Sequence, residues 1–146
     1  MSTRTLSFAA VLLAAVALAG CGGSSSSPTP APASGATVNA TSVGTVGTVL
    51  VAGSNGHTLY EFANDVNGSG TSACTGGCAT TWPPLAAPAT GSPTGGSGVT
   101  GTFATITRSD GIVQVTYNGS PLYVYSGDSA AGQSNGNYPK WSPAKP

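Results

Sequence analysis

Charged side chains are scarce in this sequence of 146 residues, and their scarcity excludes several kinds of function. The chain has four basic residues, four acidic residues, a formal net charge of zero and one histidine, His57. Because no basic stripe is present to neutralise phosphates, nucleic acid is not an expected partner. Because the carboxylates are too few and too scattered, a site for a hard cation such as Ca²⁺ is not expected either.

Helical periodicity is missing from the sequence beyond its first 20 residues. No later window repeats apolar residues every 3.6 positions, and glycine, threonine, serine, asparagine and proline dominate. Short β-branched and aromatic runs alternate with turn pairs such as Asn118-Gly119, which permit the positive φ of tight hairpins. The sequence therefore predicts an all-β domain. Its expected strands are 46–51, 57–62, 103–108, 112–117 and 121–125.

A signal for export and lipid attachment ends at Cys21. One positive charge, Arg4, precedes an apolar run over 8–18, which is too short to span a bilayer and has the length of a signal-peptide core. The tetrapeptide that ends at Cys21, Leu-Ala-Gly-Cys, resembles the bacterial lipobox. We therefore expect residues 1–20 to be a signal peptide and the bilayer to hold the protein through acylated Cys21, typically with palmitate.

Gly22 adds a prediction about which membrane holds the protein. It stands where lipoproteins retained in the inner membrane of Gram-negative bacteria usually carry aspartate. The resemblance implies an outer-membrane location in such a source, facing the periplasm or the surface.

A tether and a single domain follow the lipidation site. Residues 21–36 have almost no apolar bulk and no charge, so we expect a flexible Gly/Ser/Pro tether. The β domain is expected over 37–146. It divides into a first repeat at about 46–85, a connection at 86–101 and a second repeat at about 102–143.

The division rests on an internal duplication. Asn55 to Asp65 aligns without gaps with Asn118 to Asp128, and five of the eleven positions are identical. Each copy is followed by a Trp-x-Pro sequence, which begins at Trp82 in the first copy and at Trp141 in the second. Matched turn, strand and terminal motif predict two equivalent halves, packed as a small pseudo-two-fold antiparallel β-sandwich or barrel.

The aromatic residues of the two copies allow two interpretations. Side chains alternate across a strand, so the two aromatics of each copy share a face while a leucine lies on the other. Both faces are then apolar, which is typical of a covered, central strand. The aromatics form the core on one interpretation and line a binding cleft on the other.

The repeated motif resembles that of a known family. The pattern Tyr-x-(Phe/Trp/Tyr)-x-x-Asp occurs as Tyr60, Phe62 and Asp65, and again as Tyr123, Tyr125 and Asp128. It is similar to the motif of the bacterial lipoproteins called secreted repeat of unknown function. The intervening segment 74–85 also resembles that family's Cys-x-Gly-x-Cys-Ala-x-x-Trp-Pro-Pro-Leu. The resemblance implies a fold and an envelope location and supplies no activity.

The cysteine pair also allows two interpretations. In an exported protein Cys74 and Cys78 would oxidise, and the intervening glycines allow the turn that a short disulfide loop needs. Alternatively, both cysteines and His57 would hold copper or act in redox chemistry.

The predicted function follows from the lack of a recognisable catalytic site in the sequence. No catalytic constellation is found, no cofactor is expected, and Asp65 and Asp128 are expected to cap turns. The favoured hypothesis is a non-enzymatic binding or scaffolding domain of an envelope lipoprotein. In that hypothesis Tyr60, Tyr123, Trp82 and Trp141 offer stacking surface to an envelope glycan or protein. The alternative is a redox or copper-handling lipoprotein.

Overall fold

The computed structural model describes residues 35–146, which form an all-β domain. The expected signal peptide and Cys21 lie outside the described residues. Within 35–146, no helix has the length and apolar character needed to cross a membrane. The strands are β1 (Val38–Val43), β2 (Gly47–Ala52), β3 (Leu59–Phe62), β4 (Phe103–Thr107), β5 (Val113–Tyr117), β6 (Ser120–Pro121), β7 (Tyr123–Val124) and β8 (Trp141–Pro143).

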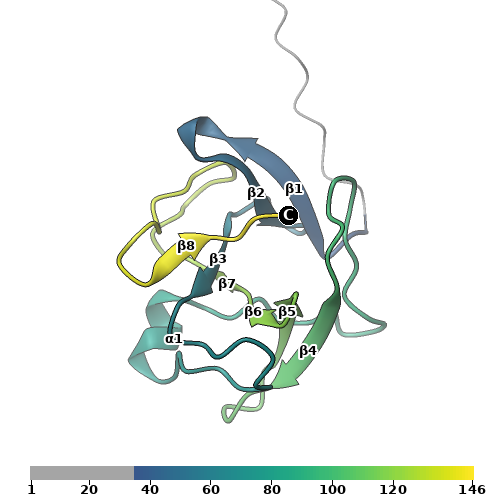
Figure 1. Cartoon of the computed structure of the whole chain (residues 1–146), viewed down its shortest axis with the longest axis vertical. Coiled ribbons are helices and arrows are strands. Elements are labelled where there is room, and N and C mark those ends of the chain that lie inside the picture. The colour runs from purple at the N-terminus through teal and green to yellow at the C-terminus, as the bar shows by residue number, and fades with distance from the viewer. Residues whose placement is uncertain (1–34) are drawn as a thin grey trace, which may run out of the picture.

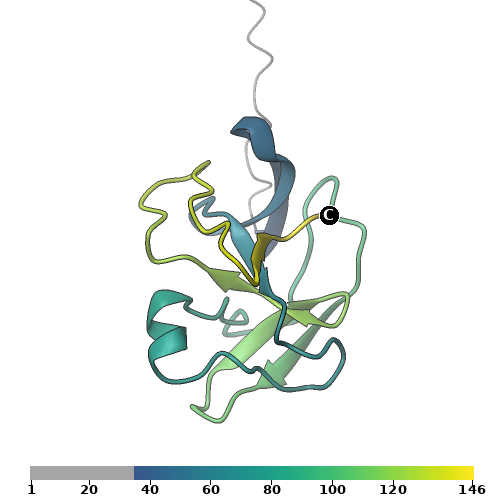
Figure 2. The ribbon, with the colours of Figure 1, turned by 60° about the vertical axis from the view of Figure 1, so that its left-hand side comes forward.

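The strands form three antiparallel sheets, whose orders are β1-β2, β7-β3-β8 and β4-β5-β6. The β1–β2 hairpin and the β4–β5 hairpin lie at opposite ends of the domain, with the sheet of β3, β7 and β8 between them (Figures 1 and 2). No closed barrel forms among the described strands. Of the two predicted architectures, packed sheets therefore describe this domain.

The two repeats follow the same order of elements. In each repeat a hairpin leads to the motif strand, and a loop then leads to the Trp-x-Pro segment. The motif strands β3 and β7 pair with each other, which places Tyr60 directly opposite Tyr123. The predicted equivalence of the two halves is thus a direct pairing of equivalent residues at the centre of the domain.

The Trp-x-Pro segments are exchanged between the repeats. β8 of the second repeat pairs with β3 of the first, with Tyr60 opposite Pro143. At the equivalent position in the other half, Pro84 of the first repeat forms an antiparallel bridge with Tyr123 of the second. Each repeat therefore completes the sheet of the other.

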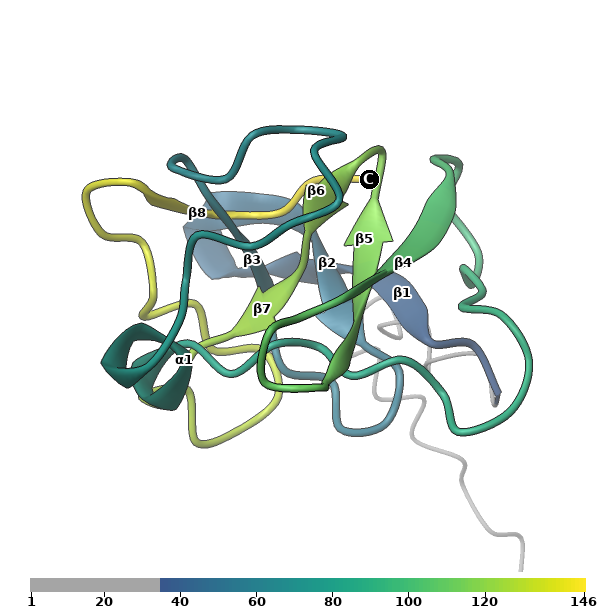
Figure 3. The ribbon, with the colours of Figure 1, turned by 90° about the horizontal axis from the view of Figure 1, so that it is seen from below.

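Strand β1, helix α1 and strand β8 were not predicted. Strand β1 was not predicted because its sequence, Val-Asn-Ala-Thr-Ser-Val, contains many polar residues. It nevertheless pairs with β2 along the whole length of β2. A single turn of helix, α1 (Gly77–Thr81), follows the first cysteine and is too short to show a helical period. It lies on the opposite side of the domain from β4 (Figure 3).

The main core lies where the hairpins meet the central sheet. It contains fully buried aliphatic residues from both repeats, which include Val38, Leu50, Leu59, Val115 and Leu122. A second, aromatic cluster lies on the other face of β3, around Tyr60 and Tyr123. The strands β3 and β7 are therefore covered on both faces, as their apolar pattern predicted.

Candidate functional site

The motif tyrosines and aspartates bond across the two repeats. The Tyr60 hydroxyl donates to Asp128 Oδ2 at 2.6 Å, and the Tyr123 hydroxyl donates to Asp65 Oδ2 at 2.5 Å. Both tyrosine side chains are completely buried. The first and last residues of the motif are therefore partners in opposite copies.

Each aspartate also holds a loop of its own repeat. Asp65 Oδ1 accepts the backbone N–H of Ala73 at 2.6 Å, and Asp128 Oδ1 accepts that of Asn135 at 2.9 Å. The predicted role in bonding backbone N–H groups is thus found, although the partners lie seven and eight residues away. The cross-repeat bond to tyrosine was not predicted, because the alignment shows equivalence and not contact.

Burial keeps the motif tyrosines in their neutral, donating form. Burial is the largest cause that raises the pKa of Tyr60 to about 12, and the bond to Asp128 raises it further. Burial and the bond to Asp65 likewise raise the pKa of Tyr123. At neutral pH both hydroxyls therefore donate to carboxylates, in the strong charge-assisted form of hydrogen bond.

A column of four aromatic rings runs beside these tyrosines, three of them stacked and the fourth, Tyr125, tilted by 33° against its neighbour. Trp82 and Trp141 stack at 3.8 Å between centroids with 4° between planes. Phe62 stacks on the outer face of Trp141 at 4.3 Å, and Tyr125 lies over Trp82 at 4.6 Å. The neighbours in the column again come from alternate repeats.

The column corrects the prediction that the tryptophans offer stacking surface. Trp82 and Trp141 are 6 % and 8 % exposed, and another aromatic ring lies against each face of both. Tyr60 and Tyr123 are core residues as well. The most exposed rings of the column are its half-buried ends, Phe62 and Tyr125.

The cysteines form a disulfide that shapes the loop before the column. Cys74 and Cys78 are bonded across the start of α1. Arg108 holds the same loop from the other repeat: its guanidinium donates to the Cys74 carbonyl at 2.6 Å and to Gln114 Oε1 at 2.9 Å. It also pairs with Asp110 at 3.1 Å. The disulfide hypothesis is confirmed.

The alternative site of Cys74, Cys78 and His57 is not assembled. Both sulfurs are bonded to each other, and within 35–146 no three His, Cys, Asp or Glu residues are grouped to hold a metal ion. His57 instead follows the turn between β2 and β3, where its carbonyl accepts the Ala52 N–H at 2.8 Å. The copper or redox arrangement proposed from these three residues is therefore not supported.

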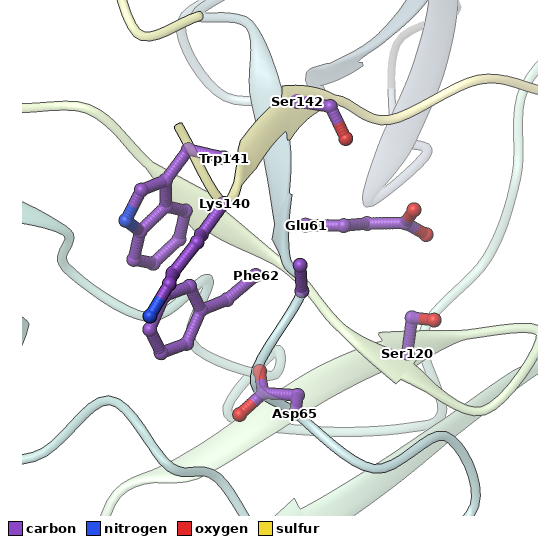
Figure 4. Close-up of a pocket in the computed structure, with 8 residues that line it drawn as sticks. Glu61, Phe62, Asp65, Ser120, Lys140, Trp141 and Ser142 are labelled. Carbon is purple, nitrogen blue, oxygen red and sulfur yellow. The ribbon is translucent and has the colours of Figure 1, made fainter. Parts of the chain in front are cut away.

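A pocket of about 420 Å³ lies at the Phe62 end of the column, lined largely by residues of the paired strands β3 and β8 and the segments beside them. We call it the β3–β8 pocket, and its lining residues are Glu61, Phe62, Ala63, Asp65, Ser120, Lys140, Trp141 and Ser142. In Figure 4, Lys140 lies with Phe62 and Trp141 on one side of β3, whereas Glu61 lies with the two serines on the other. The pocket thus joins an aromatic face to polar groups of both charges.

The pocket lies where the two repeats differ most in chemistry. The positions equivalent to Glu61, Lys140 and Ser142 are Val124, Thr81 and Pro83. The motif residues recur in both repeats because both halves of the scaffold need them. Glu61, Lys140 and Ser142 thus have no counterpart of the same type in the other copy, whereas Asp65, which also lines the pocket, recurs as Asp128. The repeated scaffold does not require the three unmatched residues.

Sequence reasoning missed Glu61, Ser120, Lys140 and Ser142. It singled out what the copies share, and these residues are unshared. Comparing the aligned copies for unmatched polar residues next to the motif would have found Glu61, which interrupts an otherwise apolar strand.

Comparisons with known proteins agree with this architecture. The family model for a secreted repeat of unknown function matches twice, at residues 40–86 and 104–145. No curated protein and no solved structure matches the chain. The matched residues cover most of the chain and both copies of the Tyr–Asp motif. The chain therefore belongs to the secreted repeat of unknown function family, and it is an exported protein built from two such repeats.

Proposed function

We propose that this protein is an envelope lipoprotein that binds an envelope component in the β3–β8 pocket and catalyses no reaction. The leader and Cys21 support the anchor, because the sequence there is similar to a lipobox. The pocket supports the binding role. The observation that carries the proposal is that polar groups foreign to the repeat pattern line the same pocket as the Phe62 end of the aromatic column.

The bonding of the aspartates supports a non-enzymatic role. In both Asp65 and Asp128, one carboxylate oxygen accepts a hydrogen bond from a tyrosine hydroxyl and the other accepts one from a backbone N–H. A carboxylate with both oxygens engaged in the scaffold is poorly placed to exchange protons with a substrate. The pocket therefore offers recognition by an aromatic ring and polar groups, which is the usual composition of a binding site.

The proposal predicts two separable attachments to the envelope. We expect Cys21→Ser, exported behind a conventional cleavable signal, to lose fatty-acid labelling and to leave the membrane fraction. Added back to washed envelope fragments, this full-length unlipidated chain should still sediment with them in a saturable way. Phe62→Ala in the same background should weaken that sedimentation about tenfold, because it removes the ring that lines the pocket.

Tyr125→Ala is the matched control, since Tyr125 occupies the other end of the column. It should sediment like the parent. Unchanged labelling of Cys21→Ser would refute the anchor. Equal sedimentation of the Phe62 and Tyr125 variants would refute the pocket.

A further inference from the structure

Three oxygen-bearing side chains gather on one side of the β3–β8 pocket. Glu61 lies opposite Ser142 in the pairing of β3 with β8, and Ser120 begins the neighbouring strand β6. Figure 4 shows the Glu61 carboxylate between the two serine hydroxyls, all on the same side of β3. The arrangement presents a carboxylate and two hydroxyl acceptors to one region of the pocket.

The Glu61 carboxylate has no cationic partner among residues 35–146. The one ion pair formed within 35–146 joins Arg108 to Asp110. Of the other charged residues that line the pocket, Asp65 is acidic, and Lys140 lies on the far side of β3 from the Glu61 carboxylate (Figure 4). Glu61 is half-buried, and burial raises the pKa of its carboxyl above the ordinary value, against a smaller opposite effect of Ser120. A partly desolvated carboxylate without a counter-charge gains from any cation that reaches it.

We propose that Glu61, Ser120 and Ser142 form a subsite for a primary ammonium group of the ligand. The inference rests on the proposed binding function of the β3–β8 pocket. An alkylammonium carries one positive charge and three N–H donors, which match the carboxylate and two hydroxyls in number and sign. Ser120 Oγ already accepts from Asn67 Nδ2 at 3.0 Å and keeps one lone pair for the ligand. Hard metal ions fit less well, because they take six or more oxygen ligands and usually several carboxylates.

The pseudo-symmetric position of the domain has no such subsite. The positions equivalent to Glu61, Ser120 and Ser142 are Val124, His57 and Pro83, which carry no carboxylate and no hydroxyl. The domain should therefore bind one ammonium group and not two.

Two envelope sources carry a primary ammonium, and matched probes distinguish them. Phosphoethanolamine represents a lipid headgroup, with glycerol phosphate as the probe that lacks the ammonium. Glucosamine represents an amino sugar, with N-acetylglucosamine as its neutral counterpart. Calorimetric titration of the full-length Cys21→Ser chain with the four probes should show binding of one ammonium probe, with one site per chain. Its counterpart should bind about tenfold more weakly or not at all.

Glu61→Gln should weaken binding of the same probe about tenfold, since it keeps the size of the side chain and removes the charge. Lys145→Gln is the matched control. It also removes one charge, at an exposed position outside the pocket lining, and it should leave binding of the same probe within about twofold. If Glu61→Gln melts at a lower temperature than the parent, Ser142→Ala takes its place, because Ser142 is exposed on β8. The serine variant should weaken binding about threefold.

Equal binding of a probe with and without its ammonium would overturn the inference, as would no binding by either ammonium probe. Full affinity in Glu61→Gln would overturn it too. If envelope sedimentation survives in Glu61→Gln but not in Phe62→Ala, the ammonium subsite is wrong and the proposed function stands. If Phe62→Ala leaves sedimentation unchanged, the proposed function itself is wrong.

Discussion

Tyr123→Ala is expected to lower the free energy of unfolding by about 3–5 kcal/mol, as truncation of a large buried aromatic does. The Tyr123 side chain is completely buried, and its ring meets Trp141 edge-on at 5.1 Å between centroids. The substitution also removes the hydroxyl that donates to Asp65 Oδ2, so this carboxylate loses a hydrogen bond that compensates for its partial burial. Urea denaturation followed by tryptophan fluorescence measures the loss, with the slope of the transition checked for two-state behaviour.

Tyr138→Ala is the control for this prediction, since the Tyr138 side chain is 49 % exposed. It should change the free energy of unfolding by about 0.5 kcal/mol or less. If Tyr123→Ala were as mild as Tyr138→Ala, Tyr123 would belong to a binding cleft and not to the core.

Arg108→Ala is the second substitution with a large expected effect. The guanidinium, with only 1 % of the side chain exposed, joins the β4–β5 hairpin to the disulfide loop of the other repeat. Its loss leaves the Cys74 carbonyl and Gln114 Oε1 buried without this donor. At about 1–3 kcal/mol for each buried acceptor, the expected destabilisation is about 2–6 kcal/mol.

Lys145→Ala provides the comparison, because it removes a positive charge from an exposed position. Thermal melts should separate the two variants clearly, with Lys145→Ala within about 0.5 kcal/mol of the parent. A similar small effect for Arg108→Ala would mean that the disulfide loop does not depend on the second repeat.

Much of the scaffold could be predicted from local signals. Asn118 and Gly119 both adopt the positive φ that their turn requires, at 49° and 86°. The turn fixes the pairing of Tyr117 with Ser120, so the hairpin was correctly predicted. The apolar pattern of the motif strands correctly predicted a central strand at 59–62, whereas β7, predicted in the same way, lies at the edge of the order β7-β3-β8.

The cross-repeat contacts could not be predicted in the same way. Aligning Tyr60 with Tyr123 shows that they are equivalent, and says nothing of whether each bonds the aspartate of its own copy or of the other. The choice follows from the pairing of β3 with β7, which depends on the packing of the whole chain. Trp82 and Trp141 looked available for a ligand for the same reason, because their partners are supplied by the other repeat.

The candidate pocket was not predicted, because the internal repeat draws attention to the positions that the two copies share. Glu61 is far in sequence from Lys140 and Ser142, and none of the three occupies a fixed position of a recognisable motif. The pairing of β3 with β8 brings them together. Attention to shared positions finds the scaffold, whereas the residues that distinguish the two copies line the pocket.

The central claim is that the two repeats interlock, each tyrosine bonding the aspartate of the other copy. Double-mutant cycles of unfolding free energy test it, using Tyr60→Phe with Asp128→Asn as the cross-repeat pair and Tyr60→Phe with Asp65→Asn as the pair within one repeat. The account predicts a coupling of about 1–3 kcal/mol across the repeats and less than about 0.5 kcal/mol within one. A larger coupling between Tyr60 and Asp65 than between Tyr60 and Asp128 would contradict it.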